Sequence, residues 1–366
     1  MKIKPTVSLC LITKNEEDCI TACIQSAAGL VDEIVVVDTG SVDHTVKLAE
    51  KLKAKVVPYA WQDDFAAARN FGLDQAAGDW ILVLDGDEVL EPVDRELFDR
   101  LLAAPGVEGY FLTIRSLLGD GEEEVSDRVV RLFKNNPLYR FEGAIHEQVI
   151  GSIKQQNGNF GLAQSGIAIF HTGYLQKRMA AKNKHQRNIC VIRRALEAKP
   201  DDPFLLYSLG IEFTQAGDIA QGNEFLASSL VRLTGREGYF HHVIMTLGTG
   251  LLQIGERERL NRLLDNALIM FPGDPEFCLL KGLTAFQSGD WQAAAAGLRQ
   301  AAAAATDTLL PLCHIQVLLA DALLMTGRND QAETAYLAAC SLAPGWHYPQ
   351  DRLLELRKRQ STIEKT

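Results

Sequence analysis

Short apolar runs alternate with amphipathic stretches along the N-terminal half of the chain. The apolar runs have the length of buried strands and cover residues 7–12, 33–37, 55–58 and 80–84. The stretches between them have helical periodicity, with Ser41 and either Asp63 or Asp64 as the expected N-cap residues. Strands that alternate with helices predict a parallel, doubly wound α/β sheet. Three later strands are expected at residues 110–115, 127–134 and 166–171.

From about residue 177 a helical repeat replaces the strand pattern. Pairs of small residues seven positions apart mark it: Gly210 and Gly217, Gly248 and Gly255, Gly282 and Gly289, and Ala320 and Gly327. Successive pairs are 38, 34 and 38 residues apart, a period that resembles tetratricopeptide repeats. The pattern predicts two domains, an α/β domain over residues 1–176 and an all-α array of stacked repeats over residues 177–366.

Composition narrows the classes of partner. The 366-residue chain has a formal net charge of −10, which argues against binding along nucleic acid or on an anionic membrane. No apolar run approaches the ~18 residues of a membrane span, and the first run is too short for a signal peptide. Seven scattered cysteines without a C-x-x-C spacing suit reduced thiols. These features predict a cytoplasmic protein with no membrane span and no nucleic-acid partner.

Polar clusters directly follow three of the predicted strands, at residues 13–16, 38–41 and 85–88. The carboxyl ends of neighbouring parallel strands meet at one edge of a sheet, where open α/β folds bind ligands. Asp85, Asp87 and Glu88 lie within four positions, and carboxylates this crowded repel one another unless a cation lies among them. Oxygen ligands suit Mg²⁺ or Mn²⁺. A single aspartate after a strand is often only a helix cap, so the indication rests on the three clusters together.

Four segments, residues 12–17, 36–43, 64–70 and 78–88, resemble motifs of the family 2 glycosyltransferases of GT-A fold. The resemblance covers about residues 5–175. With the repeats, the chain is similar to the branch that contains sublancin-type peptide S-glycosyltransferases and lipopolysaccharide-core glucosyltransferases. It implies a metal-dependent, inverting glycosyltransferase with Mn²⁺ or Mg²⁺ as cofactor. The donor would be a nucleotide-diphosphate sugar, with a UDP-sugar favoured, and the acceptor a peptide, a protein or a glycan. The repeats would recognise the acceptor or hold a partner, and homo-oligomerisation stays open.

The same resemblance implies a role for each candidate site residue. Six residues would contact the nucleotide sugar: Thr13, Glu16, Asp38, Arg69, Asp85 and Gly86. Asp87 and His171 would ligate the metal, and Glu147 would be the base that takes the acceptor proton. His146 would contact a phosphate or the acceptor, and the sequence allows it to exchange roles with His171.

Two arginines lie further along, on a later predicted strand. Arg128 and Arg131 follow Asp127 closely. They face either the diphosphate or solvent, and the pattern leaves both alternatives open.

Two other functions are compatible with parts of the sequence. Residues 85–89 also fit the D-x-D-x-[T/V] motif of haloacid-dehalogenase-like phosphohydrolases, in which the first Asp is phosphorylated. That family carries the motif on its first strand, whereas three predicted strands precede it here. The second alternative is a non-catalytic scaffold, whose repeats bind a partner and whose first domain is degenerate. Hydrolysis of nucleotide sugars with and without Mn²⁺ separates all three functions.

Overall fold

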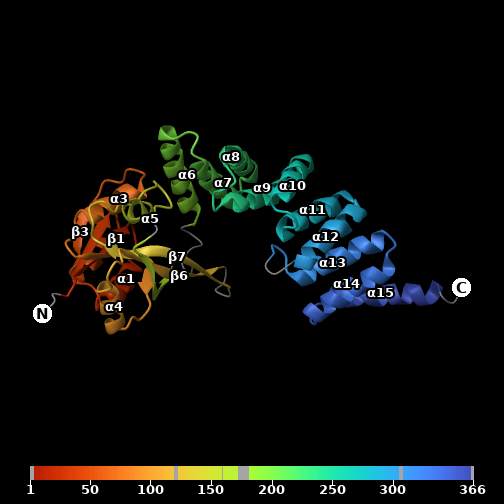
Figure 1. The fold of residues 1–366 in the computed structure, drawn as a ribbon, viewed down its shortest axis with the longest axis horizontal. Coiled ribbons are helices and arrows are strands. Elements are labelled where there is room, and N and C mark those ends of the chain that lie inside the picture. Colours follow the sequence, from red (N-terminus) through yellow and green to blue (C-terminus); the bar gives the residue numbers. More distant parts are fainter. Residues whose placement is uncertain (1–3, 119–122, 159, 172–180, 305–307, 364–366) are drawn as a thin grey trace. The chain divides into compact units, whose positions relative to one another are not determined.

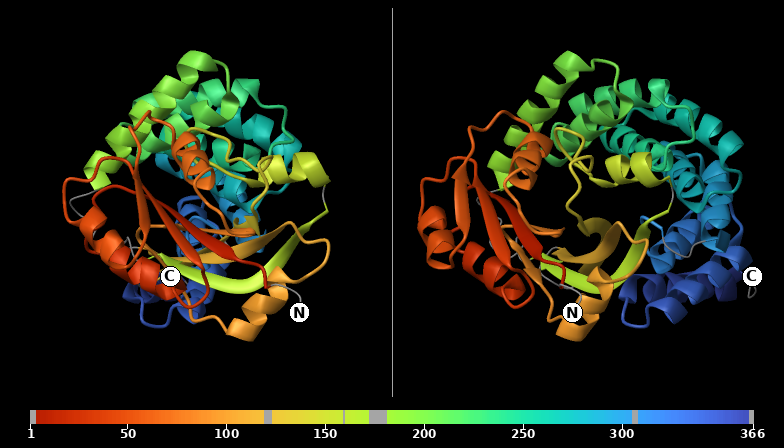
Figure 2. Two further views of the ribbon diagram at one scale, coloured as in Figure 1. Left: turned by 90° about the vertical axis from the view of Figure 1, so that its left-hand side faces the viewer. Right: turned by 60° about the vertical axis from the view of Figure 1, so that its left-hand side comes forward.

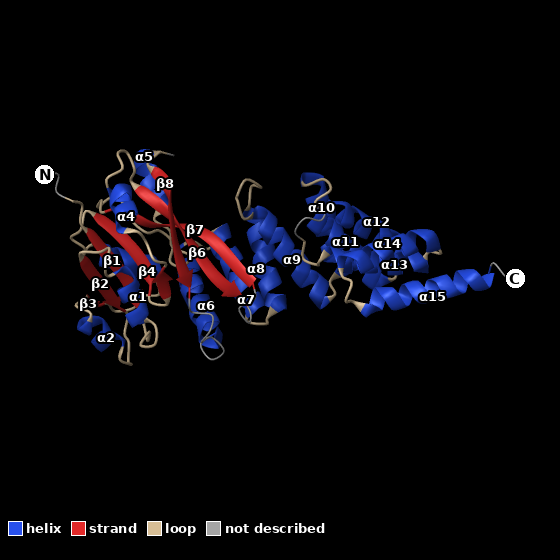
Figure 3. Cartoon of the chain, turned by 90° about the horizontal axis from the view of Figure 1, so that it is seen from below, coloured by secondary structure: helices blue, strands red, loops and turns tan. Residues whose placement is uncertain are grey.

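The computed structural model describes residues 4–118, 123–158, 160–171, 181–304 and 308–363 (Figure 1). Contacts between residues divide the chain into two compact units, Met1–Ala198 and Lys199–Thr366. Within the described residues, the strands all belong to the first unit and the second unit is helical (Figure 3). This confirms the predicted fold class, an α/β domain followed by a helical array. The predicted boundary between residues 176 and 177 lies outside the described residues.

The described part of the first unit contains one eight-stranded sheet with the order β3-β2-β1-β4-β7-β6-β8-β5. Its strands are β1 Val7–Thr13, β2 Glu33–Asp38, β3 Lys55–Pro58, β4 Trp80–Asp85, β5 Glu88–Leu90, β6 Gly109–Leu118, β7 Glu123–Lys134 and β8 Leu162–His171. The strands β1 to β4 are parallel to one another, as the alternating pattern predicts. β7 is antiparallel to both β4 and β6, β8 is parallel to β6, and β5 is antiparallel to β8. The later strands therefore make the sheet mixed.

Helices cover both faces of this sheet. Those of the first unit are α1 Ile20–Ala27, α2 Thr45–Lys51, α3 Phe65–Leu73, α4 Arg95–Leu102, α5 Ile150–Asn157 and α6 Ala181–Ala198. Successive strand residues face opposite sides. Helices α1, α2 and α4 share one core with Leu9 and Leu82, whereas α3 and α5 share another with Val35 and Ile81. The domain thus has three layers, with the sheet between two groups of helices (Figure 2).

One of the expected helix caps is confirmed and one is wrong. The Asp64 carboxylate accepts a hydrogen bond of 2.8 Å from the Ala67 N–H and so caps α3. Ser41 does not cap α2, which begins four residues later, at Thr45. The Ser41 hydroxyl instead accepts a hydrogen bond of 2.9 Å from the Asn15 N–H. It joins the loop after β2 to the loop after β1, and the helix starts only where this loop ends.

The second unit is built from paired helices. They are α7 Pro203–Gln215, α8 Ile219–Arg232, α9 Phe240–Ile254, α10 Arg257–Met270, α11 Pro275–Ser288, α12 Trp291–Ala304, α13 Leu312–Met325, α14 Asn329–Leu342 and α15 His347–Ile363. The two small residues that mark each repeat are needed for different structural reasons. A Cβ at Gly282 of α11 would lie 2.9 Å from Leu298 Cγ of α12, so the first marker allows the helices to cross closely. Gly289 has φ +76° and ends α11 in the left-handed conformation. The predicted repeats are therefore confirmed.

Two expectations drawn from the sequence, on membrane spans and on the cysteines, can be compared with the described residues. No helix of the described residues is both long and apolar enough to cross a membrane. The seven cysteines, all within the described residues, are free thiols. Cys10, Cys23 and Cys278 are buried, in keeping with thiols that fill the core.

Candidate functional site

Three strand ends place their polar residues along one edge of the sheet. Thr13 of β1 pairs in register with Asp38 of β2, and Ile12 of β1 with Asp85 of β4. Because β1 lies between β2 and β4, the segments that follow the three strands emerge side by side. This edge is formed by the carboxyl ends of parallel strands, the usual ligand-binding edge of an α/β fold.

Thr13 and Asp38 are both buried at this edge. Thr13 is 4% exposed, and its Oγ1 has no hydrogen-bond partner among the described residues. The Asp38 carboxylate accepts hydrogen bonds of 3.1 Å from the N–H groups of Gly40 and Ser41. A buried hydroxyl without a partner is destabilising unless a ligand or a water molecule satisfies it. Thr13 is therefore available to a polar group that enters this edge.

Gly86 allows the segment after β1 to approach the turn after β4. A Cβ at residue 86 would lie 2.9 Å from Glu16 Cγ and 3.5 Å from Thr13 Cγ2. The first of these contacts is too short for a real side chain, so residue 86 must be glycine if Glu16 is to stay in place. Glu16, Thr13 and the 85–88 turn thus form one continuous wall.

A chain of ion pairs, buried except at Asp85, includes Asp85 and Glu88 of this turn. Arg69 Nη2 donates to Asp85 Oδ1 at 2.6 Å, and Arg69 Nε donates to Glu147 Oε1 at 2.6 Å. Arg131 Nη2 donates to Asp85 Oδ2 at 3.0 Å and to Glu88 Oε1 at 2.8 Å. Both Asp85 oxygens therefore accept from guanidinium groups. Three carboxylates and two guanidinium groups alternate along the chain, so that each charge is paired.

Burial and the alternation of charge set the electrostatics of this network. Burial acts to lower the pKa of Arg69, but the carboxylates of Asp85 and Glu147 outweigh it and raise this pKa. Burial acts to raise the pKa of Asp85, but Arg69 and Arg131 hold it well below its usual range. Burial raises the pKa of Glu88 to about 7, against the opposing effect of Arg131. Asp85 is therefore ionised throughout the neutral pH range, and both arginines are charged.

Asp87 lies outside this network and contacts a histidine from the other end of the domain. The Asp87 Oδ2 and His171 Nε2 atoms are 2.9 Å apart. The pairing of β5 with β8 brings them together, because Glu88 lies opposite His171 in the ladder. No group of three or more His, Cys, Asp or Glu side chains suited to a metal ion is found in the described part of the chain. A carboxylate oxygen and an imidazole nitrogen suit Mn²⁺, provided that a ligand and water complete the shell.

Glu147 and His146 end a strained loop between β7 and α5. Gly143 has φ +98° and His146 has φ +54°, which is uncommon for a residue other than glycine. A bridge between Glu142 and Gln148 closes the loop. His146 is exposed, whereas the Glu147 side chain is 11% exposed and turned towards Arg69. The loop thus directs two adjacent side chains into different environments.

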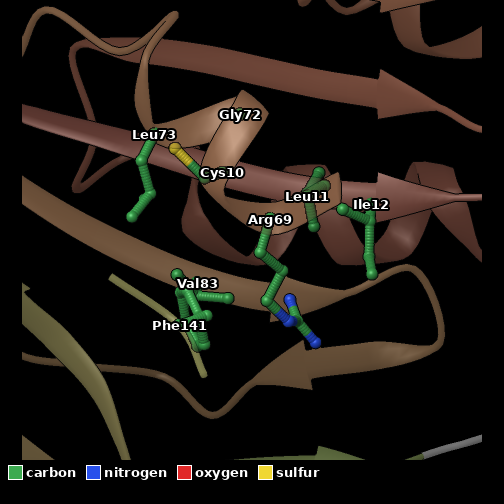
Figure 4. Close-up of a pocket in the computed structure, with 8 residues that line it drawn as sticks. All are labelled: Cys10, Leu11, Ile12, Arg69, Gly72, Leu73, Val83 and Phe141. Carbon is green, nitrogen blue, oxygen red and sulfur yellow. The ribbon is translucent and has the colours of Figure 1, made fainter. Parts of the chain in front are cut away.

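A small cavity lies beneath the site, between β1, β4 and α3. Its lining includes Cys10, Arg69, Leu73 and Phe141 (Figure 4). Its volume of about 10 Å³ is enough for one water molecule. Arg69 Nη1 is buried without a hydrogen-bond partner among the described residues. This cavity is too small for a nucleotide, so a ligand of that size would bind at the open sheet edge.

The structure brings the sequence-predicted residues into three groups. Thr13, Glu16, Asp38 and Gly86 line the sheet edge, while Arg69, Asp85 and Glu147 are joined by ion pairs and Asp87 contacts His171. Arg131, for which the sequence leaves the diphosphate and solvent open, is buried between two carboxylates, whereas Arg128 is exposed. The sequence contains a sign of this burial, because Arg131 interrupts the apolar run 130–133. A charged side chain in such a run needs a buried partner of opposite charge.

Comparison with known proteins identifies relatives of both units. Residues 8–157 match the glycosyl transferase family 2 model, and residues 245–310 match a tetratricopeptide repeat model. A TPR repeat-containing protein of Synechococcus elongatus is 36% identical over 230 residues, which are 61% of this chain and 56% of that protein. The SPbeta prophage-derived glycosyltransferase SunS of Bacillus subtilis is 25% identical over 257 residues, which are 68% of this chain and 59% of SunS. The chain thus spans less than two thirds of the length of these relatives.

Among solved structures, glucosyl-3-phosphoglycerate synthase from Mycobacterium tuberculosis matches 44% of this chain and 68% of its own. The TM-score is 0.33 and the identity 21%. A likeness this distant supports no inference about the site.

Proposed function

We propose that this chain, whose residues 8–157 form a glycosyl transferase family 2 domain, is a metal-dependent, inverting glycosyltransferase that uses a nucleotide-diphosphate sugar. The observation that carries the proposal is the register of β2, β1 and β4. It gathers Asp38, Thr13 and Asp85 at one edge of the sheet, next to the Asp87–His171 pair. A ligand at this edge would meet acceptors for its base and ribose and two ligands for its diphosphate-bound metal.

The donor half of the site would be the sheet edge itself. Thr13, Glu16 and Asp38 would line the nucleotide pocket, and the unpartnered Thr13 hydroxyl would bond a polar group of the nucleotide. Asp85 would accept from a ribose hydroxyl, since its side chain is the most exposed member of the ion-pair chain, at 34%. Gly86 keeps the wall between Glu16 and the turn closed. We expect a UDP-sugar as donor.

Asp87 and His171 would hold the metal, Mn²⁺ or Mg²⁺. Two protein ligands fit an ion that keeps water molecules and takes further oxygens from a substrate phosphate. A bound metal of this kind neutralises the negative charge that develops on the leaving diphosphate. The residues of the chain would fix its place, because the β5–β8 ladder sets the distance between Asp87 and His171.

Glu147 would act as the base. It would take the proton from the acceptor hydroxyl or thiol as that atom forms a bond to the anomeric carbon. The bond from this carbon to the diphosphate breaks on the opposite face, which inverts the configuration. His146, exposed beside Glu147, would contact the acceptor or a phosphate. The acceptor would be a peptide, a protein or a glycan, and the repeat unit would help to recognise it.

The arrangement of Asp85 does not favour the phosphohydrolase alternative. A nucleophilic aspartate needs a free oxygen, whereas both Asp85 oxygens accept from guanidinium groups.

A donor screen with the full chain tests the proposal. UDP-glucose, UDP-N-acetylglucosamine and UDP-galactose are added with Mn²⁺ or with EDTA, and thermal unfolding and UDP release are measured. A donor at 100 times its Kd stabilises the native state by about 2.7 kcal/mol. We expect one donor to raise the unfolding temperature and to release UDP, in both cases only with Mn²⁺. If no UDP-sugar binds or releases UDP, the non-catalytic scaffold becomes the better description.

A further inference from the structure

Helix α3 holds the loop that carries Glu147. The Phe65 N–H donates to the Ala144 carbonyl at 2.9 Å. The Asn70 side chain bonds the backbone of Phe141 twice, donating to its carbonyl at 3.0 Å and accepting from its N–H at 2.8 Å. Phe65 at the start of α3 and Asn70 further along the helix therefore hold Ala144 and Phe141 of the segment 141–147. Arg69 lies between these anchors in the helix.

Arg69 bridges the two halves of the site. Its Nε binds Glu147 and its Nη2 binds Asp85, both at 2.6 Å. The guanidinium group is planar and rigid, so two carboxylates bound to different nitrogens are held at a defined separation. The guanidinium carbon also lies 5.4 Å from the centre of the Phe141 ring, which supports it from one side. The position of Glu147 is thus set by the position of Asp85.

Asp85 is itself fixed from behind. Its second oxygen accepts from Arg131, and Arg131 is paired with Glu88. Glu88 accepts a further hydrogen bond of 2.8 Å from the Asp85 N–H, which ties it to the backbone of the same turn. Glu88 is 3% exposed. Arg69 is therefore bound to a carboxylate that is itself held in place. Because Arg69 also binds Glu147, the position of Glu147 is fixed as well.

The resemblance implies that Arg69 contacts the nucleotide, but its burial leaves it poorly placed to touch a substrate. The residue is 7% exposed, and the space beside it holds about one water molecule. Figure 4 shows Arg69 among residues of β1, α3 and β4, together with Phe141. Its two strongest contacts run to carboxylates that belong to the donor and acceptor halves of the proposed site. Its effect on a substrate is therefore indirect.

We propose that Arg69 is a positioning residue that locks the base Glu147 to the donor-binding carboxylate Asp85. Through Phe65, Arg69 and Asn70, helix α3 then holds in place the loop that forms the acceptor side of the site. This inference rests on the proposed function, in which Glu147 is the base and Asp85 contacts the donor.

A double-mutant cycle tests it, with UDP release from the UDP-sugar that the screen selects, in Mn²⁺, as the assay. The variants are Arg69→Lys, Glu147→Gln and both together. Lysine keeps the charge, but its flexible ammonium group lacks the planar fork that holds two carboxylates at a defined separation. We expect Arg69→Lys to lower kcat by roughly 10- to 100-fold, because a base displaced by about 1 Å loses that much. The donor KM should stay within about twofold of wild type, and the double variant should be no slower than Glu147→Gln alone.

Several results would overturn the proposal. Multiplicative losses in the double variant would mean that Arg69 acts independently of Glu147. Wild-type kcat in Arg69→Lys would show that the bridge is not needed, and a rise in donor KM alone would make Arg69 a donor contact. Arg95→Lys is the matched control, since it alters a partly exposed ion pair with Asp99 on α4 of the same domain, and it should leave kcat and KM unchanged.

Asn70→Ser covers the case in which Arg69→Lys does not fold. It leaves every ion pair in place and removes an anchor of the 141–147 segment. We expect a lower kcat at unchanged donor KM. An unchanged kcat would show that α3 does not position the loop that carries Glu147. Failure of the proposed function is distinguishable, because it shows in the wild type as the absence of UDP release from every UDP-sugar.

Discussion

The three acidic side chains of the 85–88 turn have different surroundings and therefore different chemistry. Asp85 is held ionised between two guanidinium groups, and Glu88 is buried against one of them. Asp87 contacts His171 on β8. Asp87 is thus the acid of this turn whose position suits a metal ligand.

Replacing Asp87 tests the metal. Asp87→Asn keeps the shape and removes the charge, so we expect loss of Mn²⁺-dependent donor binding with the fold intact. Calorimetric titration of the variant with UDP and Mn²⁺ measures this, and near-UV circular dichroism checks the fold. Asp99→Asn, which alters an exposed ion pair with Arg95, is the control. Turnover by the wild type that is the same in EDTA would remove the metal from the mechanism.

Replacing Glu147 tests the base. Glu147→Gln keeps the size of the side chain and loses the proton acceptor, so kcat should fall by ~10²–10⁴ while donor affinity stays near wild type. Steady-state kinetics and a donor titration give the two values. Collapse of donor binding would assign Glu147 to the nucleotide pocket. Asp127, which is exposed on β7, would then be the next carboxylate to examine as the base.

At this scale the sequence predicts which residues meet but not how they pair. Asp85, Asp87 and Glu88 suggest one cluster around a cation, because adjacent acids share the same local sequence. The three acids have different partners because of Arg131 and His171. These two residues are more than forty positions away in the chain and reach the turn only through sheet pairing. Local periodicity contains no information about such partners.

At the scale of elements, the parallel half of the sheet was predictable and the mixed half was not. The strands β1 to β4 alternate with helices, and this order implies parallel pairing. Helices separate β5 from β6 and β7 from β8, but none of the described helices lies between β6 and β7. An apolar run has the same appearance in either direction. The antiparallel pairing of β7 with β4 therefore had no counterpart in the pattern. It is this pairing that places Arg131 against Asp85.

The N-terminus of α3 allows a prediction with a matched control. Asp64 caps α3 and Asp94 caps α4, each by accepting from a backbone N–H three residues on. Asp64→Ala and Asp94→Ala should each lower the free energy of unfolding by about 1 kcal/mol, measured by urea denaturation. Only Asp64→Ala should also lower kcat, because α3 carries the anchors of Glu147. Equal activity in the two variants would contradict this dependence.

At the scale of the whole molecule, α6 belongs to the first unit. Arg194 Nη1 of α6 is 2.8 Å from Asp63 Oδ2, and the Arg187 guanidinium lies 5.1 Å from the centre of the Phe65 ring. Both contacts support the start of α3. The change of sequence pattern predicts a domain of residues 1–176, whereas the contacts divide the chain after Ala198.

Truncated chains test the two domain boundaries, after residue 176 and after residue 198. We expect a fragment of residues 1–198 to bind UDP with Mn²⁺ and to unfold at a higher temperature than residues 1–176, because it keeps the contacts of α6 with α3. It should release UDP slowly but not transfer sugar to the physiological acceptor. Full transfer by the fragment would show that the repeats are not needed for recognition. A well-folded fragment that does not bind the donor would place part of the nucleotide pocket in the repeats.

The close crossings at the marker glycines have a consequence for the cooperativity of the second unit. Helices of the array contact those of the adjacent pair, so its stability is a sum of local interfaces and not of one central core. Such a chain opens one pair at a time, starting at an end that has a neighbour on one side only. Amide hydrogen exchange should accordingly be fastest in α15 and slowest in α10 and α11. A destabilising substitution near the C-terminus would then loosen the helices next to it and leave α10 and α11 protected.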